Sequence, residues 1–106
     1  MTDPLTPSAP LARKLDTLPD GPGVYLWKDA SGTVIYVGKA KRLRGRVRSY
    51  FLGDHAESPK SRLLVRHIAD VETIVVPDEV QSLLLENNLI KTYQPRFNVR
   101  LKDDKS

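Results

Sequence analysis

Two tyrosines, Tyr25 and Tyr36, are the first residues whose type and spacing indicate chemistry. They lie eleven positions apart in two short segments, Gly23-Val24-Tyr25 and Tyr36-Val37-Gly38. A phenol can donate a hydrogen bond, accept one or, when activated, take a proton from water. Two tyrosines that only stabilise neighbouring strands would give the same pattern. The pair alone therefore leaves both interpretations open.

Glu86 carries the most specific chemical signal. Its neighbours three and four positions away in a helix would be Ser82, Leu83, Leu89 and Ile90, so its carboxylate lies on a mostly apolar face. A carboxylate there is costly unless it is paired, neutralised or bound to a metal. One interpretation is a buried ion pair with an arginine or a lysine. The other is a ligand for Mg²⁺, which commonly uses only one or two protein carboxylates and takes its other ligands from water and substrate phosphate.

A basic segment, Lys39–Arg48, adds a candidate phosphate-binding surface. Six of its ten residues are Lys or Arg and none is acidic. These charges repel one another in an isolated helix, and a polyanion relieves the repulsion. A solvated charged face is the alternative. Lys39 and Arg46 are expected beside Tyr50. We expect the other four basic side chains to bind nucleic-acid phosphates: Lys41, Arg42, Arg44 and Arg48.

A predicted β-hairpin and a predicted helix position these side chains. Gly23–Lys28 and Thr33–Gly38 form the hairpin, and symmetric closure of its loop would make Tyr25 and Tyr36 direct cross-strand neighbours. Lys39–Leu52 is predicted as one helix, with a turn of 100° per residue. Its apolar stripe is Ala40, Leu43, Val47 and Phe51. Lys39, Arg46 and Tyr50 would lie within roughly 40° of each other on the neighbouring stripe.

The remaining elements predict a small α/β fold, in which a central, mostly antiparallel sheet is flanked by helices. Asp78 and Gln81 resemble a capping box that opens a helix running to about Tyr93. The other expected elements are helices over Ala12–Leu18 and from Ser58-Pro59 to about Ala69, a strand over Val71–Val76 and a short edge strand over Arg96–Leu101. Residues 1–17 are expected to be a flexible leader and residues 18–106 one domain.

Composition restricts the class of protein. The chain has 106 residues, enough for one small domain, with a net charge of +4. It has no cysteine, which excludes disulfides and thiolate metal sites. Its apolar runs are far shorter than the ~20 residues that span a bilayer, and its N-terminus lacks the apolar core of a secretory signal. We therefore expect no membrane association and a cytoplasmic protein.

The same residues resemble a known family of nucleases. Gly23-Val24-Tyr25 followed by Tyr36-Val37-Gly38 resembles the GIY-YIG signature, with valine in place of both isoleucines. The continuation is similar to the N-terminal domain of UvrC, the nuclease subunit of the bacterial UvrABC excision repair system. The resemblance covers about residues 18–106. The segments that carry it are Tyr36–Lys41, Ser49-Tyr50-Phe51, Leu85–Lys91 and Tyr93–Val99.

This resemblance implies a metal-dependent endonuclease that makes the incision on the 3′ side of a DNA lesion. The implied partners are damaged double-stranded DNA and UvrB, the latter bound through regions outside this chain, with no small-molecule substrate. Motif matching assigns Glu86 as ligand of one Mg²⁺ or Mn²⁺ and Tyr36 as the general base, whose phenolate Lys39 and Arg46 would favour. The implied catalytic residues are Tyr25, Tyr36, Lys39, Arg46, Tyr50 and Asn98.

Two other functions fit parts of the pattern. In a non-catalytic module, the tyrosines would stack on bases and the basic segment would follow a nucleic-acid strand. Such a module has no use for Glu86 on an apolar helix face. Another GIY-YIG enzyme, such as a homing endonuclease or a structure-specific nuclease, is the second alternative. The segments Leu85–Lys91 and Tyr93–Lys102 favour the repair protein.

Overall fold

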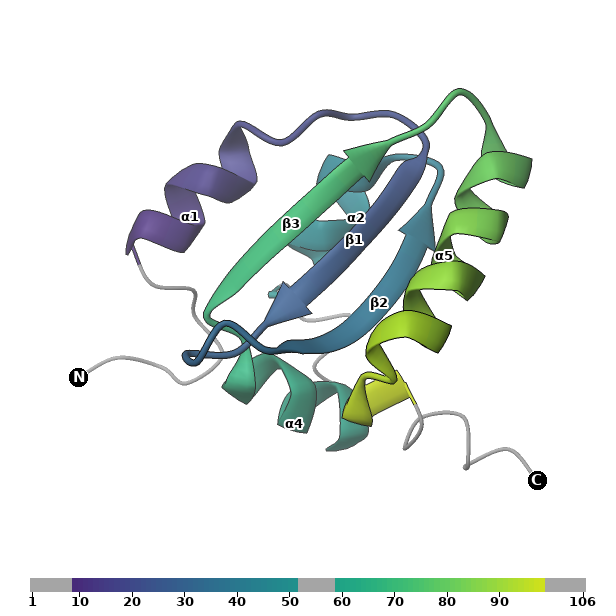
Figure 1. Cartoon of the computed structure of the whole chain (residues 1–106). Helices are drawn as coiled ribbons and strands as arrows, with labels where there is room; N and C mark the ends of the chain where they lie inside the picture. The colour runs from purple at the N-terminus through teal and green to yellow at the C-terminus, as the bar shows by residue number, and fades with distance from the viewer. Residues whose placement is uncertain (1–8, 52–58, 99–106) are drawn as a thin grey trace.

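A three-stranded antiparallel sheet forms the centre of the molecule (Figure 1). The computed structural model describes residues 9–51 and 59–98. In the sheet, β1 lies between β2 and β3 and pairs antiparallel with both. The α/β fold with a small central antiparallel sheet is therefore confirmed. The elements are α1 (Ala9–Asp16), β1 (Gly23–Lys28), β2 (Val34–Ala40), α2 (Leu43–Ser49), α4 (Pro59–His67), β3 (Asp70–Val75) and α5 (Glu79–Tyr93).

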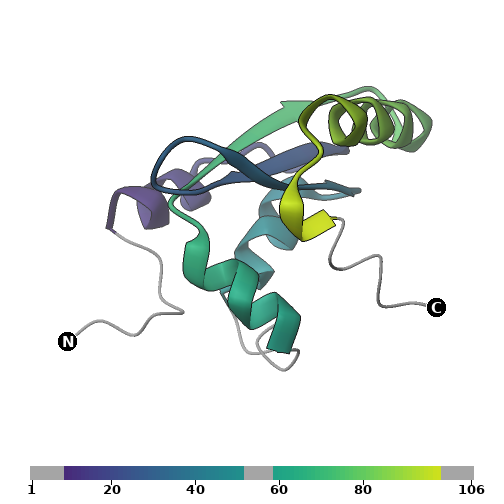
Figure 2. The ribbon, with the colours of Figure 1, turned by 60° about the horizontal axis from the view of Figure 1, so that its bottom comes forward.

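Helices cover both faces of the sheet, so the molecule has two hydrophobic cores. Figure 2 shows α5 on one side of the sheet and α2 and α4 on the other. The smaller core lies under α5 and consists of Val24, Leu26, Val34 and Val37, with Leu85, Leu89 and Ile90 packed on it. The larger core lies on the opposite face and includes Tyr25, Trp27, Ile35, Leu43, Val47, Tyr50, Leu64, Val71 and Phe97. Because β1 alternates between the two cores, nearly its whole length is buried.

The hairpin forms as predicted, but its register differs. Tyr25 pairs with Gly38, and Tyr36 pairs with Trp27, so the predicted direct pairing of the two tyrosines is wrong. Two shifts of one residue each cause the difference. Lys28 pairs with Val34 rather than with Thr33, and a bulge then leaves Ile35 as an extra residue in β2. In a regular ladder continued from the Lys28–Val34 pair, Tyr36 would pair with Leu26 and point to the other face of the sheet. The bulge instead places it on the face of Tyr25 and Trp27, against the larger core.

The predicted helix from Lys39 begins too early. Residues 39 and 40 continue β2, where Lys39 pairs with Val24 and Ala40 with Gly23, and α2 begins only at Leu43. Lys39 therefore does not share a helical stripe with Arg46 and Tyr50. The predicted apolar stripe is confirmed for its centre, since Leu43 and Val47 are fully buried.

The helix α5 agrees closely with its prediction. Asp78 is its N-cap, and the Asp78 carboxylate accepts a hydrogen bond from the Gln81 N–H at 2.9 Å. The helix ends at Tyr93, and Gln94 follows with a left-handed φ of 44°. Within residues 9–51 and 59–98, none of the helices combines the length and the apolar composition that a membrane-spanning helix needs.

The short edge strand predicted from Arg96 is wrong over its described part. Residues 96–98 are helical, and the Asn98 N–H donates to the Pro95 carbonyl at 3.1 Å. The buried ring of Phe97 turns into the larger core rather than lying on a sheet. Residues 99–101 of that prediction lie outside the described residues.

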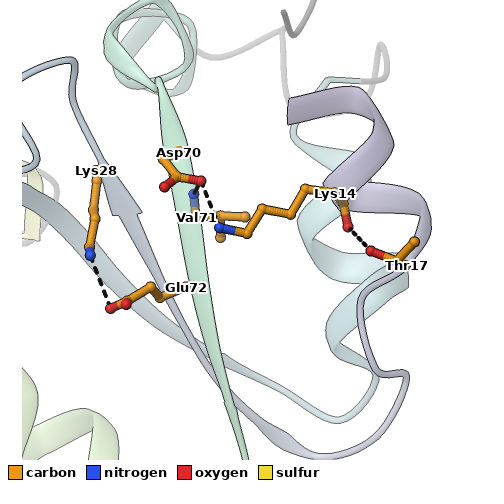
Figure 3. A network of polar contacts seen from close by, with 6 residues as sticks. All are labelled: Lys14, Thr17, Lys28, Asp70, Val71 and Glu72. Atoms are coloured by element: carbon orange, nitrogen blue, oxygen red, sulfur yellow. Dashed lines mark hydrogen bonds and ion pairs between the residues drawn. The ribbon is translucent and has the colours of Figure 1, made fainter. Parts of the chain in front are cut away.

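The helix α1 packs onto the larger core from the start of the described chain. It begins at Ala9, earlier than predicted, and its Leu11 and Leu15 are buried. An ion pair of 2.8 Å joins Lys14 of α1 to Asp70 of β3 (Figure 3). Part of the expected leader is therefore a packed helix, while residues 1–8 lie outside the described residues. The domain boundary expected at residue 18 stays a prediction.

Candidate active site

Three tyrosines from three elements meet at one end of the larger core. The Tyr25 and Tyr50 hydroxyl oxygens are 2.7 Å apart and share a hydrogen bond that either can donate. The Tyr25 ring centroid lies 5.7 Å from that of Tyr50 and 6.3 Å from that of Tyr36. Tyr25 and Tyr50 are buried and Tyr36 is half-buried. The structure thus brings together the three tyrosines expected at the site, which we call the tyrosine cluster.

Gly38 provides the space that the tyrosine cluster needs. It faces Tyr25 across the hairpin, and a Cβ built at Gly38 would collide with the Tyr25 ring and hydroxyl. Any side chain at this position would push the ring away from Tyr50. From the sequence alone, a glycine at this position is also compatible with a strand end or a bulge. The pairing that reveals this role depends on the β2 bulge, for which the sequence gives no clear signal.

Burial dominates the ionisation of the tyrosine cluster. Burial raises the pKa of Tyr36, Tyr50 and the Glu86 carboxylate raise it further, and Arg46 lowers it. Burial also raises the pKa of Tyr25, again against Arg46. The pKa of Tyr50 is raised by burial, but hydrogen bonds from Tyr25 and Tyr36 and the charge of Arg46 oppose the increase. Arg46 thus favours the phenolates as expected, but its effect is smaller than that of burial.

A basic hollow adjoins the tyrosine cluster. It has a volume of about 700 Å³ and is lined by Lys39, Ala40, Lys41, Arg42, Gly45, Arg46 and Ser49. Arg46 connects the two features, because it lines the hollow and its charge acts on all three tyrosines. Four positive side chains around one concave surface suit the phosphates of a nucleic-acid strand.

The other two arginines of the basic segment do not line this hollow. A guanidinium nitrogen of Arg44 lies 3.8 Å from a carboxylate oxygen of Asp20, and a guanidinium nitrogen of Arg48 lies 3.9 Å from a carboxylate oxygen of Asp16. The basic segment therefore has carboxylate partners after all, supplied by a part of the chain that precedes β1. Of the four residues predicted to bind phosphate, Lys41 and Arg42 line the hollow, whereas Arg44 and Arg48 face the end of α1 and the loop that follows it.

Glu86 lies on the flank of α5 that faces the site. Its side chain is half-buried, and its carboxylate raises the pKa of Tyr36, which places the negative charge near that phenol. Two helical turns earlier on the same flank, Glu79 lies 3.5 Å from Lys41 of the hollow. The Glu86 carboxylate, the tyrosine cluster and the basic hollow therefore converge at the edge of the sheet that β2 forms.

Asn98 supports the site by hydrogen bonding to the backbone of β2. The Val37 N–H donates to the Asn98 side-chain oxygen at 2.7 Å, and the Asn98 amide donates to the Val37 carbonyl at 2.9 Å. The buried side chain thus pairs with the outer edge of β2 as a neighbouring strand would. It holds the backbone between Tyr36 and Gly38. The catalytic role that the motif match implies for Asn98 stays a prediction.

The carboxylate environment fits a magnesium-type ion. In residues 9–51 and 59–98, no three His, Cys, Asp or Glu side chains gather into a metal-binding group. A cation at Glu86 would therefore keep several waters and take further oxygen ligands from a substrate phosphate, as Mg²⁺ commonly does. The adjoining basic hollow would bring that phosphate to the carboxylate. The residues present fit a single hard divalent cation.

Comparison with known proteins identifies the family of this site. The model of the UvrC-like GIY-YIG domain matches residues 21–99. UvrABC system protein C from Gemmatimonas aurantiaca is 63% identical over 97 residues, which cover 92% of this chain and 16% of that protein. The chain belongs to the family of UvrC-like GIY-YIG domains. The same protein from Chlorobaculum tepidum is 56% identical over 95% of this chain and 16% of its own length.

A solved structure agrees with this membership. The magnesium-bound crystal structure of the GIY-YIG N-terminal endonuclease domain of UvrC from Thermotoga maritima has a TM-score of 0.74 and 39% identity to this chain. The match covers 85% of this chain and 97% of that one. The expected GIY-YIG fold, the endonuclease class and the use of a divalent cation in this type of domain are thereby confirmed. The chain spans only about one sixth of the length of the two UvrABC system C proteins above.

Proposed function

We propose that this chain hydrolyses a DNA phosphodiester bond and makes the 3′ incision beside a lesion in bacterial nucleotide excision repair. The observation that supports this proposal best is the convergence of Glu86, the tyrosine cluster and the basic hollow. Damaged double-stranded DNA is the proposed substrate. UvrB is the proposed partner, bound through regions outside this chain, and the cytoplasm is the proposed location. The relatives named above are components of the UvrABC system, which supports these assignments.

The basic hollow would hold the DNA backbone. Lys39, Arg42 and Arg46 present positive charge to it, and Lys41 can exchange its exposed pairing with Glu79 for a phosphate. Arg46 lies between this surface and the tyrosines, so it would contact the phosphate at which negative charge develops. A phosphate in the hollow would thereby lie within the influence of both the phenols and Glu86.

Glu86 would hold the divalent cation, together with water and the scissile phosphate. When bound, Mg²⁺ or Mn²⁺ polarises the phosphate and stabilises the leaving oxygen. Glu86 is also one of the groups that raise the pKa of Tyr36. Neutralising its charge would therefore favour proton loss from Tyr36, which we propose as the base that accepts a proton from the attacking water. Tyr25 and Tyr50 would then orient the Tyr36 hydroxyl.

Replacement of Glu86 tests the proposal. We expect Glu86→Gln to slow nicking of lesion-containing DNA at least about 100-fold in Mg²⁺, while DNA affinity changes little. Binding of Mn²⁺ to the protein, measured by electron paramagnetic resonance, should be lost in the same variant. Glu72→Gln is the matched control, because Glu72 pairs with Lys28 on β1 at 3.1 Å and has no part in the proposed site.

The same experiment separates the alternatives. Nicking and Mn²⁺ binding at the level of the unaltered chain in Glu86→Gln would contradict the metal role of this residue. A chain that binds DNA in the salt-dependent manner of a basic protein, but never nicks it in any divalent cation, would instead be a non-catalytic binding module.

A further inference from the structure

Trp27 lies against the tyrosine cluster in the middle of β1. It is fully buried, and it pairs across the sheet with Tyr36 on one side and Val71 on the other. Its ring centroid lies 5.2 Å from that of Tyr50, at an interplanar angle of 70°. The Tyr25 ring lies 6.0 Å away at 68°. The indole is thus in edge-to-face contact with two of the three tyrosines.

The polar atom of Trp27 is directed toward the same place. The indole N–H is buried, and within the described part of the chain it makes no hydrogen bond of standard geometry. The Tyr50 hydroxyl lies on the side of the indole, since the two rings are in edge-to-face contact, and the N–H lowers the pKa of that hydroxyl, as a nearby donor does. An indole nitrogen can only donate, and a buried donor is costly unless an acceptor is close. The Tyr50 oxygen is the candidate acceptor on that side of the ring.

We propose that Trp27 is a positioning residue of this site, which directs its indole N–H to the Tyr50 oxygen and so orients the Tyr50 hydroxyl toward Tyr25 and Tyr36. A phenol oxygen carries one proton and two lone pairs. With one lone pair facing Trp27, the proton and the other lone pair are left for the two neighbouring tyrosines. The catalytic part of this inference rests on the proposed function, whereas the N–H contact does not.

A spectroscopic experiment tests the contact without reference to activity. Trp27 is the only tryptophan of the chain, so its indole N–H gives a single resonance in a proton–nitrogen correlation spectrum. Tyr50→Phe keeps the ring and removes the acceptor, and we expect the indole proton resonance to move upfield. Phe51→Leu is the control. The Phe51 ring also packs on Trp27, with ring centroids 5.8 Å apart and an interplanar angle of 87°, but it has no polar atom. An equal shift in both variants, or none in Tyr50→Phe, would overturn the contact.

A kinetic experiment tests the consequence. Trp27→Phe removes the N–H and keeps an aromatic ring, and we expect a single-turnover nicking rate about fivefold lower than that of the unaltered chain, the effect of losing one hydrogen bond to an uncharged group. DNA affinity should stay the same, and Phe51→Leu should nick at the normal rate. If Trp27→Phe does not fold, replacement of the sole tryptophan by its benzothiophene analogue deletes the N–H alone.

The two possible failures can be told apart. A normal nicking rate in the folded Trp27→Phe or benzothiophene protein would overturn the positioning role, even though the chain is an active nuclease. A chain that does not nick in its unaltered form would contradict the proposed function, and the resonance of the indole N–H would still report whether Trp27 contacts Tyr50.

Discussion

A single missing side chain, at Gly38, allows the tyrosine cluster to form. The Tyr25 ring lies over Gly38, its partner in the hairpin, in the space that a Cβ would occupy. From there the Tyr25 hydroxyl reaches that of Tyr50 at 2.7 Å. The glycine is therefore part of the geometry of the phenols, and its conformational freedom is not the reason it is needed at this position.

Replacing Gly38 by alanine should separate the tyrosines. The added methyl group must displace either the Tyr25 ring or the β2 backbone, at a cost of about 1–3 kcal/mol in the free energy of unfolding. We expect nicking to fall at least about tenfold, because small displacements of catalytic groups reduce rates strongly. Urea unfolding and single-turnover nicking measure the two effects. Gly21→Ala is the control, since a Cβ there meets nothing within 4 Å; equal behaviour of the two variants would contradict the role of Gly38.

At this scale, residue types could be predicted from the sequence, whereas most side-chain contacts could not. The tyrosines, Arg46 and Glu86 were selected by type and spacing, and the structure brings them together. The pairing of Tyr25 with Gly38 was not predicted, because Lys28 pairs one residue later than symmetric closure requires and Ile35 adds a second residue of shift. The contact of Asn98 with Val37 was not predicted either, since the two residues are 61 positions apart in the sequence.

At the scale of the element, α2 separates two groups of basic side chains. Arg42 and Arg46 line the hollow, whereas Arg44 and Arg48 face the carboxylates of Asp20 and Asp16. These two ion pairs are long and partly exposed, so each contributes little stability. Their effect is to reduce the repulsion between the basic side chains of the helix, which a bound polyanion would reduce further.

Arg42 and Arg44 form a matched pair for testing this division. We expect Arg42→Ala to weaken DNA binding and to reduce the slope of log affinity against log salt by about 1, because one phosphate contact and its released counterion are lost. Arg44→Ala removes the same charge from the other side of the helix, so it should leave the slope unchanged. Fluorescence anisotropy of labelled duplex DNA over a salt series measures both. Equal loss of slope in the two variants would show that both arginines bind DNA.

Element boundaries were predictable where local signals are strong. The capping box at Asp78 predicted the start of α5, and the predicted end near Tyr93 agrees with the proline at position 95, which cannot continue the helix. The start of α2 was not predictable from periodicity, because the pairing of Lys39 and Ala40 with β1 extends the strand into a segment with helical spacing. Hydrogen bonds between β1 and β2 determine where α2 begins, and the local sequence pattern does not encode these bonds.

At the scale of the whole molecule, the tyrosine cluster lies between the sheet and the helices of the larger core. Tyr25, Tyr36 and Tyr50 come from β1, β2 and the end of α2, so the packing of these elements removes three phenols from water. The fold therefore stabilises the neutral phenols, since burial raises the pKa of each of them. The stability of the fold and the ionisation of the site are coupled for that reason.

This coupling predicts a loss of stability at alkaline pH. In the unfolded chain, Tyr25, Tyr36 and Tyr50 ionise near the ordinary value of 10.0, whereas in the folded chain the pKa of each of these three phenols is higher. The unfolded state therefore binds fewer protons above about pH 10, and the free energy of unfolding must fall as pH rises further. Below about pH 10 the stability that the neutral phenols contribute is fully present.

Replacing Tyr25 by phenylalanine should make the free energy of unfolding fall less steeply with pH. Urea unfolding between about pH 8 and pH 11, followed by the fluorescence of Trp27, measures this fall. Tyr93→Phe removes a half-exposed phenol at the end of α5 and should show the same steepness as the unaltered chain. Identical slopes for Tyr25→Phe and Tyr93→Phe would mean that the fold does not hold the cluster neutral, and that ionisation of the phenols is independent of the packing of β1, β2 and α2.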